Sequence, residues 1–187
     1  ASNFGGTRNG LVIHWPRGIK AKNQIRSQFH HVIDVAPTVY EATGIPAPRK
    51  VNGIVQRPIE GISMLYSFNH PKAPDARKTQ YFEMIGNRAI YHDGWFAGTI
   101  HKAPWEAQPR RPLDQDIWEL YNVNEDFSLS RDVAAQYPEK LAALKQKFTE
   151  EAVKFNVLPL DDRSIERLDP AIAGRPDLMN GRTKLVL

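Results

Sequence analysis

Two neighbouring histidines and an aspartate are the first residues whose types and spacing could do chemistry. His30 and His31 precede Asp34, and positions 30 and 34 would share one face of a helix. Imidazole and carboxylate groups are common metal ligands, so a metal site is one interpretation. Three residues from one short segment rarely complete such a site, and a histidine at the start of a helix more often packs or hydrogen-bonds the backbone. We therefore favour a structural role and assign no metal ligand.

A loop that carries cations beside a tryptophan is the second candidate. His101, Lys102 and Trp105 occur together, and Arg110 and Arg111 follow in the same polar, proline-rich stretch. Cations beside a flat apolar ring could form the rim of a pocket for an anionic aromatic compound. The alternative is a surface loop whose tryptophan packs on the sheet below it, and we give this alternative the greater weight, although loops often carry function.

Motifs for a nucleophile or a phosphate cradle are missing. The glycine-rich residues 3–10 lack the order GxxxxGK[ST] and precede a predicted strand, whereas phosphate loops follow a strand and open a helix. No serine lies in a Gly-x-Ser-x-Gly elbow. The chain has no cysteine, which removes thiolate ligands, disulfides and a cysteine nucleophile. No catalytic residue can be assigned within the chain.

The elements that must position these residues begin with a strand and a helix, which we assign to residues 1–60. The apolar run 11–15 (LVIHW) is bounded by glycine and proline and predicts a buried strand. Apolar residues at three- and four-residue spacing predict an amphipathic helix over 29–44, with Asp34 as its N-cap and Gly44 at its C-terminal end. Proline-rich residues follow, and we assign 61–76 to a connector.

A small antiparallel sheet is predicted in the next part of the chain, residues 77–160. Three β-prone runs are joined by Gly86-Asn87 and Asp93-Gly94, which supply the positive φ angles of tight hairpins. The three runs are 79–85, 88–92 and 95–100. The alternating residues 117–121 (IWELY) predict a fourth strand.

One long helix should cover this sheet. Pro138 opens a segment whose apolar residues form a single stripe. The stripe consists of Leu141, Leu144, Phe148, Ala152 and Phe155. We expect a two-layer α+β unit of three to four strands packed with this helix, followed by a linker or wrapping tail at 161–187.

Composition and charge exclude several classes of protein. The 187 residues are 41% hydrophobic and 10% aromatic, which is typical of a folded globular chain with one ordinary domain or two small ones. The net charge is +4, but basic and acidic residues are interspersed, which does not favour a nucleic-acid module. No apolar stretch approaches the roughly 20 residues that cross a bilayer. We therefore expect neither nucleic acid nor a membrane as a partner.

Several segments, in the same order along the chain, resemble the sulfatase family and in particular the long bacterial arylsulfatases. The resemblance covers roughly residues 4–165, with Met64 standing where the family usually has leucine in a Gly-x-Ser-Leu pattern. The segments are 4–20 (FGGTRNGLVIHWPRGIK), 28–46 (QFHHVIDVAPTVYEATGIP), 51–65, 80–95 and 118–126. Such ordered agreement is more specific than any one of these motifs.

The resemblance implies that this chain is an α+β fragment of an alkaline-phosphatase-like α/β fold. It would comprise the last strand and helix of the large domain and the small C-terminal domain. Enzymes of this family hydrolyse sulfate esters with a formylglycine, made within a Cys/Ser-x-Pro-x-Arg motif, and a divalent cation, usually calcium. That motif does not occur in the chain, and the resemblance places the metal ligands and the catalytic lysine upstream of Ala1. We therefore expect the chain to be inactive alone.

The resemblance also implies partners and a pocket rim. The partners would be the rest of the sulfatase polypeptide and, in the intact enzyme, a small-molecule sulfate ester, in the bacterial periplasm or cytoplasm. The residues near the pocket or at its rim would be Asn3, Phe4, Arg8, His101, Lys102 and Trp105. The alternative function is a non-catalytic binding or interaction module descended from a sulfatase, which would have to cover the incomplete edge of residues 1–60 by self-association.

Overall fold

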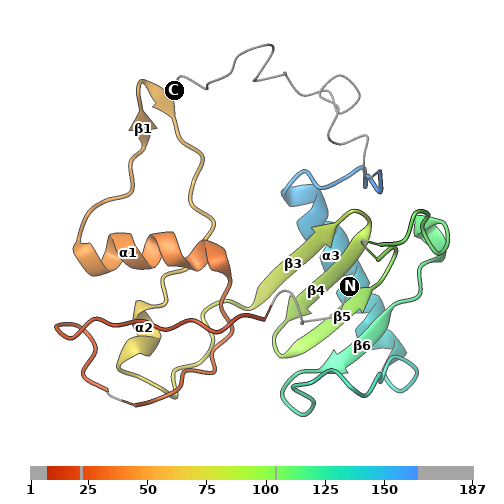
Figure 1. The fold of residues 1–187 in the computed structure, drawn as a ribbon, viewed down its shortest axis with the longest axis horizontal. Helices are drawn as coiled ribbons and strands as arrows, with labels where there is room; N and C mark the ends of the chain where they lie inside the picture. The colour runs from red at the N-terminus through yellow and green to blue at the C-terminus, as the bar shows by residue number, and fades with distance from the viewer. Residues whose placement is uncertain (1–7, 22, 104, 164–187) are drawn as a thin grey trace. The chain divides into compact units, whose positions relative to one another are not determined.

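The computed structural model describes residues 8–21, 23–103 and 105–163, and these residues form two compact units (Figure 1). The first, here called the sheet unit, contains residues 81–90 and those from 94 onward. The second, the helix unit, contains the residues up to 80 together with 91–93. None of the helices within the described ranges is long and apolar enough to cross a membrane.

A four-stranded sheet with the strands in chain order is the main element of the sheet unit (Figure 1). The strands are β3 (Thr79–Met84), β4 (Asn87–His92), β5 (Trp95–Thr99) and β6 (Glu119–Asn122). β5 and β6 are antiparallel, with Trp95 opposite Asn122 and Gly98 opposite Glu119. The predicted meander and its fourth strand are confirmed, although β6 begins at Glu119 rather than at Ile117.

Two tight turns join the first three strands. Asp93 and Gly94 have φ angles of 48° and 82°, which confirms the predicted Asp-Gly turn. In the first turn the residues with positive φ are Ile85 (53°) and Gly86 (81°), and Asn87 is already in β4. The predicted Gly86-Asn87 turn is therefore wrong by one residue, because Gly86 supplies the second positive φ of the turn and the β-branched Ile85 accepts the first.

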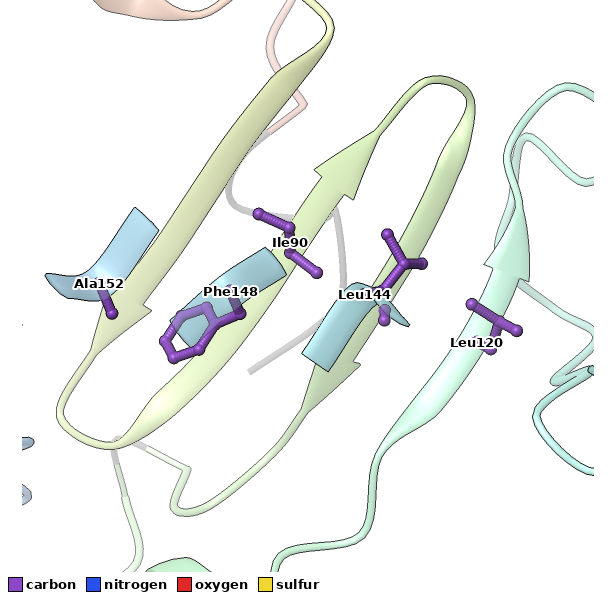
Figure 2. Close-up of a cluster of buried hydrophobic side chains, with 6 residues drawn as sticks. Ile90, Leu120, Leu144, Phe148 and Ala152 are labelled. Carbon is purple, nitrogen blue, oxygen red and sulfur yellow. The ribbon is translucent and has the colours of Figure 1, made fainter. Parts of the chain in front are cut away.

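The helix α3 (Pro138–Lys154) covers one face of this sheet. Pro138 stands in its first turn, as predicted. Three residues of the predicted stripe, Leu144, Phe148 and Ala152, are buried against Ile90, Ala97 and Leu120 of the strands (Figure 2). Burial of one leucine or phenylalanine side chain contributes about 2–3 kcal/mol, so this layer is the main apolar core of the unit.

The opposite face of the sheet carries a second apolar cluster. It consists of Ala89, Phe96, Tyr121 and Leu129. Neighbours along a strand, such as Phe96 and Ala97, therefore belong to different clusters, because successive side chains of a strand point to opposite faces. The sheet is thus apolar on both faces.

The helix unit contains two short helices, a 3-10 turn and a small hairpin. A 3-10 turn at Val32–Asp34 leads into α1 (Val35–Thr43), and α2 (Leu65–Phe68) follows later. Strands β1 (Lys50–Val51) and β2 (Ile54–Val55) form a hairpin that the sequence did not predict.

The predicted helix is confirmed in part. Gly44 ends α1 with φ 68°, as expected of a C-terminal glycine. The helix begins after Asp34 rather than near Phe29. Asp34 occupies the N-cap position, but its side chain makes no capping hydrogen bond to α1 and instead accepts one from the His31 amide at 2.9 Å.

The strand predicted at residues 11–15 is absent from the described structure. These residues have no regular secondary structure, and Leu11 and Val12 are 58% and 95% exposed. An apolar run becomes a buried strand only where neighbouring strands accept its backbone hydrogen bonds and cover its side chains. The described part of the chain provides no such neighbour, so the prediction is wrong for this chain.

Candidate functional site

The predicted rim residues His101, Lys102 and Trp105 lie on one loop, residues 101–116, between β5 and β6. The amide side chain of Asn87 in β4 holds the start of this loop. Its Oδ1 accepts hydrogen bonds from the His101 and Lys102 amides at 3.0 and 3.3 Å, and its Nδ2 donates to the Lys102 carbonyl at 2.9 Å. The side chain therefore replaces the backbone partners that the chain loses where it leaves the sheet.

The imidazole of His101 is fully buried between two carboxylates. Its Nδ1 lies 2.9 Å from Oδ2 of Asp116, and its Nε2 lies 3.2 Å from Oδ2 of Asp162. Each ring nitrogen donates or accepts according to the tautomer, because a neutral imidazole donates from one nitrogen and accepts at the other. The ring thus joins the two ends of the loop and also binds the segment that follows α3.

A second cation reaches Asp116 from β4. Nη2 of Arg88 pairs with the Asp116 carboxylate and donates to the Leu113 carbonyl at 2.9 Å. The guanidinium also lies over the ring of Trp118, 5.5 Å from its centroid. Its Nε is buried and has no hydrogen-bond partner among the described residues. Asp116, which no sequence motif singled out, is therefore the centre of this buried network.

The side chain of Trp105 is 80% exposed on this loop. The interpretation in which this tryptophan packs on the sheet is therefore wrong. The loop around it is internally bonded: Glu106 Oε2 accepts from the Ala103 amide at 2.6 Å, and the Arg110 amide donates to the His101 carbonyl at 3.1 Å. The hydrogen bond from Ala103, and then the side chain of Arg110, hold the pKa of Glu106 below its usual value.

The other predicted pocket residues lie elsewhere. Arg8 belongs to the helix unit, where partial burial lowers the pKa of its guanidinium. Asn3 and Phe4 lie outside the described residues. The structure thus brings together His101, Lys102 and Trp105 on one loop, with His101 at its buried base.

Asp34 forms a buried ion pair with Arg77 in the helix unit. The carboxylate is fully buried and accepts hydrogen bonds from the Ile62 amide at 2.8 Å and from Arg77 Nε at 2.9 Å, and it pairs with Arg77 Nη2. Burial opposes its ionisation, but the contact with His30, the Arg77 guanidinium and two backbone amides outweigh burial and hold the pKa of Asp34 well below its usual range. Arg77 could not be linked to Asp34 from sequence alone, because the two residues are 43 positions apart.

His30, His31 and Asp34 are not grouped as metal ligands in the described structure. Nδ1 of His30 lies 3.6 Å from Asp34 Oδ2, longer than a hydrogen bond, and the pKa of His31 is lowered by burial and then by Arg77. Within the described ranges, no group of three or more His, Cys, Asp or Glu side chains is arranged to hold a metal ion. The Asp34 carboxylate instead accepts hydrogen bonds from Arg77 and from backbone amides.

Two shallow hollows lie in the helix unit. One, of about 400 Å³, adjoins the C-terminal end of α1 near Tyr40 and Ile59. The other, of about 380 Å³, lies near Trp15 and Phe68. Neither is lined by any of the described rim residues.

The helix unit exposes many aliphatic side chains, whereas its buried apolar residues among those described are Met64, Phe68 and Tyr91. The exposed ones include Val32, Ile33, Val35 and Val39 at and before α1, and Val51, Ile54 and Val55 of the hairpin. An exposed apolar surface of this kind is characteristic of a protein–protein interface.

Comparisons with known proteins give a consistent fold. No protein-family model matches the chain. Among solved structures, the chain is similar to BT33336S-sulf, from the core genetic locus with which Bacteroides thetaiotaomicron metabolises multiple glycosaminoglycans (21% identity, TM-score 0.51, 75% of this chain and 28% of that chain). It is also similar to BT4656, described in complex with its substrate D-glucosamine-2-N,6-O-disulfate. The identity is 20% and the TM-score 0.56, over 82% of this chain and 30% of that chain.

A third similar structure is Ps i-CgsB, with 17% identity and a TM-score of 0.56 over 91% of this chain and 34% of that chain. The chain therefore spans roughly a third of the length of the structures that it matches. The resemblance to the sulfatase family is thus confirmed at the level of the fold, and the chain has the fold of one part of these larger sulfatase structures.

Proposed function

We propose that the intact protein is a sulfate ester hydrolase with an alkaline-phosphatase-like fold, and that this chain forms a structural part of it that is inactive alone. The observation that carries the proposal is the combination of ordered sequence resemblance with a shared fold over 75–91% of the chain. The sulfated substrate in the description of BT4656 supports the choice of substrate class.

The chain's own residues do not fit the chemistry that the family uses. A formylglycine needs a cysteine or serine in a Cys/Ser-x-Pro-x-Arg motif, and the chain has neither a cysteine nor a serine in that context. The described side chains also offer no cluster of three metal ligands. In our proposal, the formylglycine and the calcium ion belong to the rest of the polypeptide, and no reaction step uses this chain's residues as catalysts.

The rest of the polypeptide is also the partner of the helix unit in this proposal. The exposed aliphatic side chains of α1 and the hairpin need a cover, and the similar structures have about two thirds of their length outside the matched part. Each such side chain contributes about 1.5–3 kcal/mol when it is fully buried. The missing part of the protein therefore has both the length and a thermodynamic reason to cover this surface.

The rim residues would act on the substrate through charge and ring contact. Lys102 would attract the sulfate group, and Trp105 on the same loop would contact the ring that carries it. His101 is buried at the base of this loop and would not touch the substrate, and Asn3 and Phe4 lie outside the described residues. None of these residues needs to exchange a proton or form a bond in this role.

The experiment compares this chain with a version extended by the residues that precede it in its gene. Both are assayed for hydrolysis of 4-nitrophenyl sulfate with calcium present, after co-expression with a formylglycine-generating enzyme. We expect turnover by the extended protein and none by the 187-residue chain. Turnover by the short chain would refute its structural role. An extended protein that carries the motif but leaves sulfate esters intact would support the alternative of a non-catalytic binding module.

A further inference from the structure

We propose that Trp105 is a stacking platform for the ring of a ring-borne sulfate ester, and that the buried pair of His101 and Asp116 positions it. This inference rests on the proposed sulfate ester hydrolase and assigns the contact with the substrate's ring to one residue. It also assigns roles to two residues that would not touch the substrate.

Exposure sets Trp105 apart from the other tryptophans. Its side chain is 80% exposed, whereas Trp15, Trp95 and Trp118 are each partly buried and pack against an aromatic ring. Tryptophan has a large apolar side chain, so a ring left in water forgoes the stabilisation that burial would give. Tryptophan is also enriched at binding interfaces, where its ring contacts a partner.

The loop that carries Trp105 is held by hydrogen bonds on both sides of the ring. Before it, Asn87 binds the amides of His101 and Lys102, and after it the Arg110 amide binds the His101 carbonyl. The ion pair between Glu106 and Arg110, at 3.1 Å, lies next to it. Because these loop residues are already held by hydrogen bonds, ligand binding would cost little conformational entropy in them. Most of the interaction free energy of the ring contact would then appear as affinity.

The contact between His101 and Asp116 closes this loop at its base. These residues are its first and last, both side chains are fully buried, and Nδ1 lies 2.9 Å from Oδ2. Arg88 secures the same carboxylate and the Leu113 carbonyl. Without the charge of Asp116, Arg88 and His101 would lose their ionised acceptor. The interaction that fixes the two ends of the loop would then be lost.

The charges on the loop favour an anionic ligand close to the ring. Lys102 precedes Trp105 and Arg111 follows it, while Glu106 is paired with Arg110 and Asp116 with His101 and Arg88. The remaining carboxylate, that of Asp114, lies nine residues after the ring. Rings stack on tryptophan faces, and guanidinium or ammonium groups bind sulfate oxygens. A ring that bears a sulfate ester matches both features.

The test is NMR of the 187-residue chain with ¹⁵N-labelled tryptophan, titrated separately with phenyl sulfate and with glucosamine 6-sulfate. We expect the Trp105 indole signal to shift saturably with at least one ligand, and the ligand with the larger shift distinguishes an aryl ring from a sugar. Trp105→Ala removes this signal, so its binding is followed on the ligand's own NMR signals, and it should be weaker by about tenfold or more. Phe127→Ala, which alters another strongly exposed aromatic ring of the same unit, should leave binding unchanged.

The positioning role is tested with Asp116→Asn and, independently, His101→Asn. We expect each to weaken binding at least about fivefold while the Trp95 and Trp118 signals keep their positions. Unchanged binding in both variants overturns the positioning role. A Trp105 signal that responds to neither ligand, or responds equally to inorganic sulfate, overturns the platform. That result leaves the proposed hydrolase intact, because turnover of the extended protein is measured separately.

Discussion

At the scale of single residues, the buried carboxylate of Asp34 in the helix unit accepts several hydrogen bonds. Its carboxylate receives hydrogen bonds from two backbone amides and from the Arg77 guanidinium, which also donates to Gln80 at 3.1 Å. Removing water from a carboxylate is costly, and only partners of this number and geometry offset that cost. The interaction links the start of α1 to the segment just before β3, so its loss should affect the whole unit.

The stability of the chain should depend on pH through Asp34. The pKa of Asp34 is lower in the folded chain than its ordinary value of 3.8, so the unfolded chain takes up the proton first as the pH falls. The stabilisation is therefore present above the ordinary value and is lost below it. We expect the free energy of unfolding, measured by urea unfolding, to begin to fall below about pH 5 and to keep falling as the pH approaches the depressed pKa of the folded carboxyl.

The Asp34→Asn variant supplies the comparison for this pH dependence. It should be less stable than the natural chain by about 3 kcal/mol near neutral pH and should show a shallower decline in acid. An equal decline in both proteins would show that other carboxylates cause the acid sensitivity.

Gly86 is the residue that lets the His101 ring approach the first turn of the sheet. Its φ is +81°, and a Cβ added there would lie 2.6 Å from the buried His101 ring. Gly94 has nearly the same φ, +82°, but its added Cβ would meet the amide of Asn124, an exposed side chain that can move. We expect Gly94→Ala to cost about 1 kcal/mol and Gly86→Ala clearly more, since only the latter displaces a packed ring.

Urea unfolding of the two alanine variants measures this difference. The turns belong to the same meander, so the cost of a positive φ is common to both and cancels in the comparison. Equal losses in the two variants would show that His101 moves aside without cost and that its position is not tightly defined.

At the scale of elements, α3 and the sheet depend on each other. The helix has an outward face of charged residues and an inward stripe, and the stripe meets strands whose inward residues are also apolar. In water alone a helix of this length is marginal, so most of its stability comes from this burial. The same holds for the strands, because a small sheet needs a covering layer.

Two aliphatic truncations on α3 test this dependence. Leu144 is 2% exposed in the core, and Val153 is 62% exposed on the same helix. We expect Leu144→Ala to lower the free energy of unfolding by about 2–5 kcal/mol, and Val153→Ala to change it by less than about 0.5 kcal/mol. Denaturant unfolding followed by circular dichroism reports both values. Similar small effects would mean that α3 does not pack on the sheet as described.

Residues 11–15 show how far an element depends on its surroundings. The run has the composition of a buried strand, yet in the described structure it has no regular structure and Val12 is 95% exposed. Its β propensity reflects a fit to a half-buried surface rather than an independent backbone preference. In a protein with a larger sheet the same residues have strand partners available.

At the scale of the whole molecule, the two units differ in how well they bury their own apolar residues. The sheet unit encloses two clusters, on the two faces of its sheet. The helix unit buries few apolar side chains and is held largely by polar contacts, such as Arg26 with the Ser67 and Phe68 carbonyls, both at 2.6 Å. A unit of this kind is expected to gain much of its stability from a covering partner.

Val39 tests the proposed covering partner. It lies on α1 and is 54% exposed, so Val39→Asp should leave the stability of the isolated chain within about 0.5 kcal/mol. The same change should weaken binding to the separately expressed upstream part of the protein about tenfold or more, as measured by calorimetry, because it would bury an unpaired charge. Val153→Asp on α3 is the matched control and should not affect binding. Loss of stability in the isolated chain would show that Val39 already has a partner within it.

Local features of the fold were predictable from the sequence. The Asp93-Gly94 turn, the Gly44 terminus of α1 and the stripe of α3 depend on residues within a few positions of each other. The predicted turn between β3 and β4 was placed one residue too late, because a glycine such as Gly86 fits either position of the turn. The residue types of the loop with Trp105 identified it as a candidate site. The sequence did not predict that the tryptophan ring would be exposed.

The sequence by itself determined the meander and the covering helix, because backbone angles and apolar spacing act over short distances along the chain. The likeness to sulfatases was also visible in the sequence, through the resemblance of several segments in the same order. Only the tertiary structure decided that Asp116 would join His101 and Arg88, 15 and 28 residues away, and that Asp34 would pair with Arg77, 43 residues away. The reason is that a buried charge is stable only beside its counter-charge, and the residue that supplies it is chosen by how distant segments fold together.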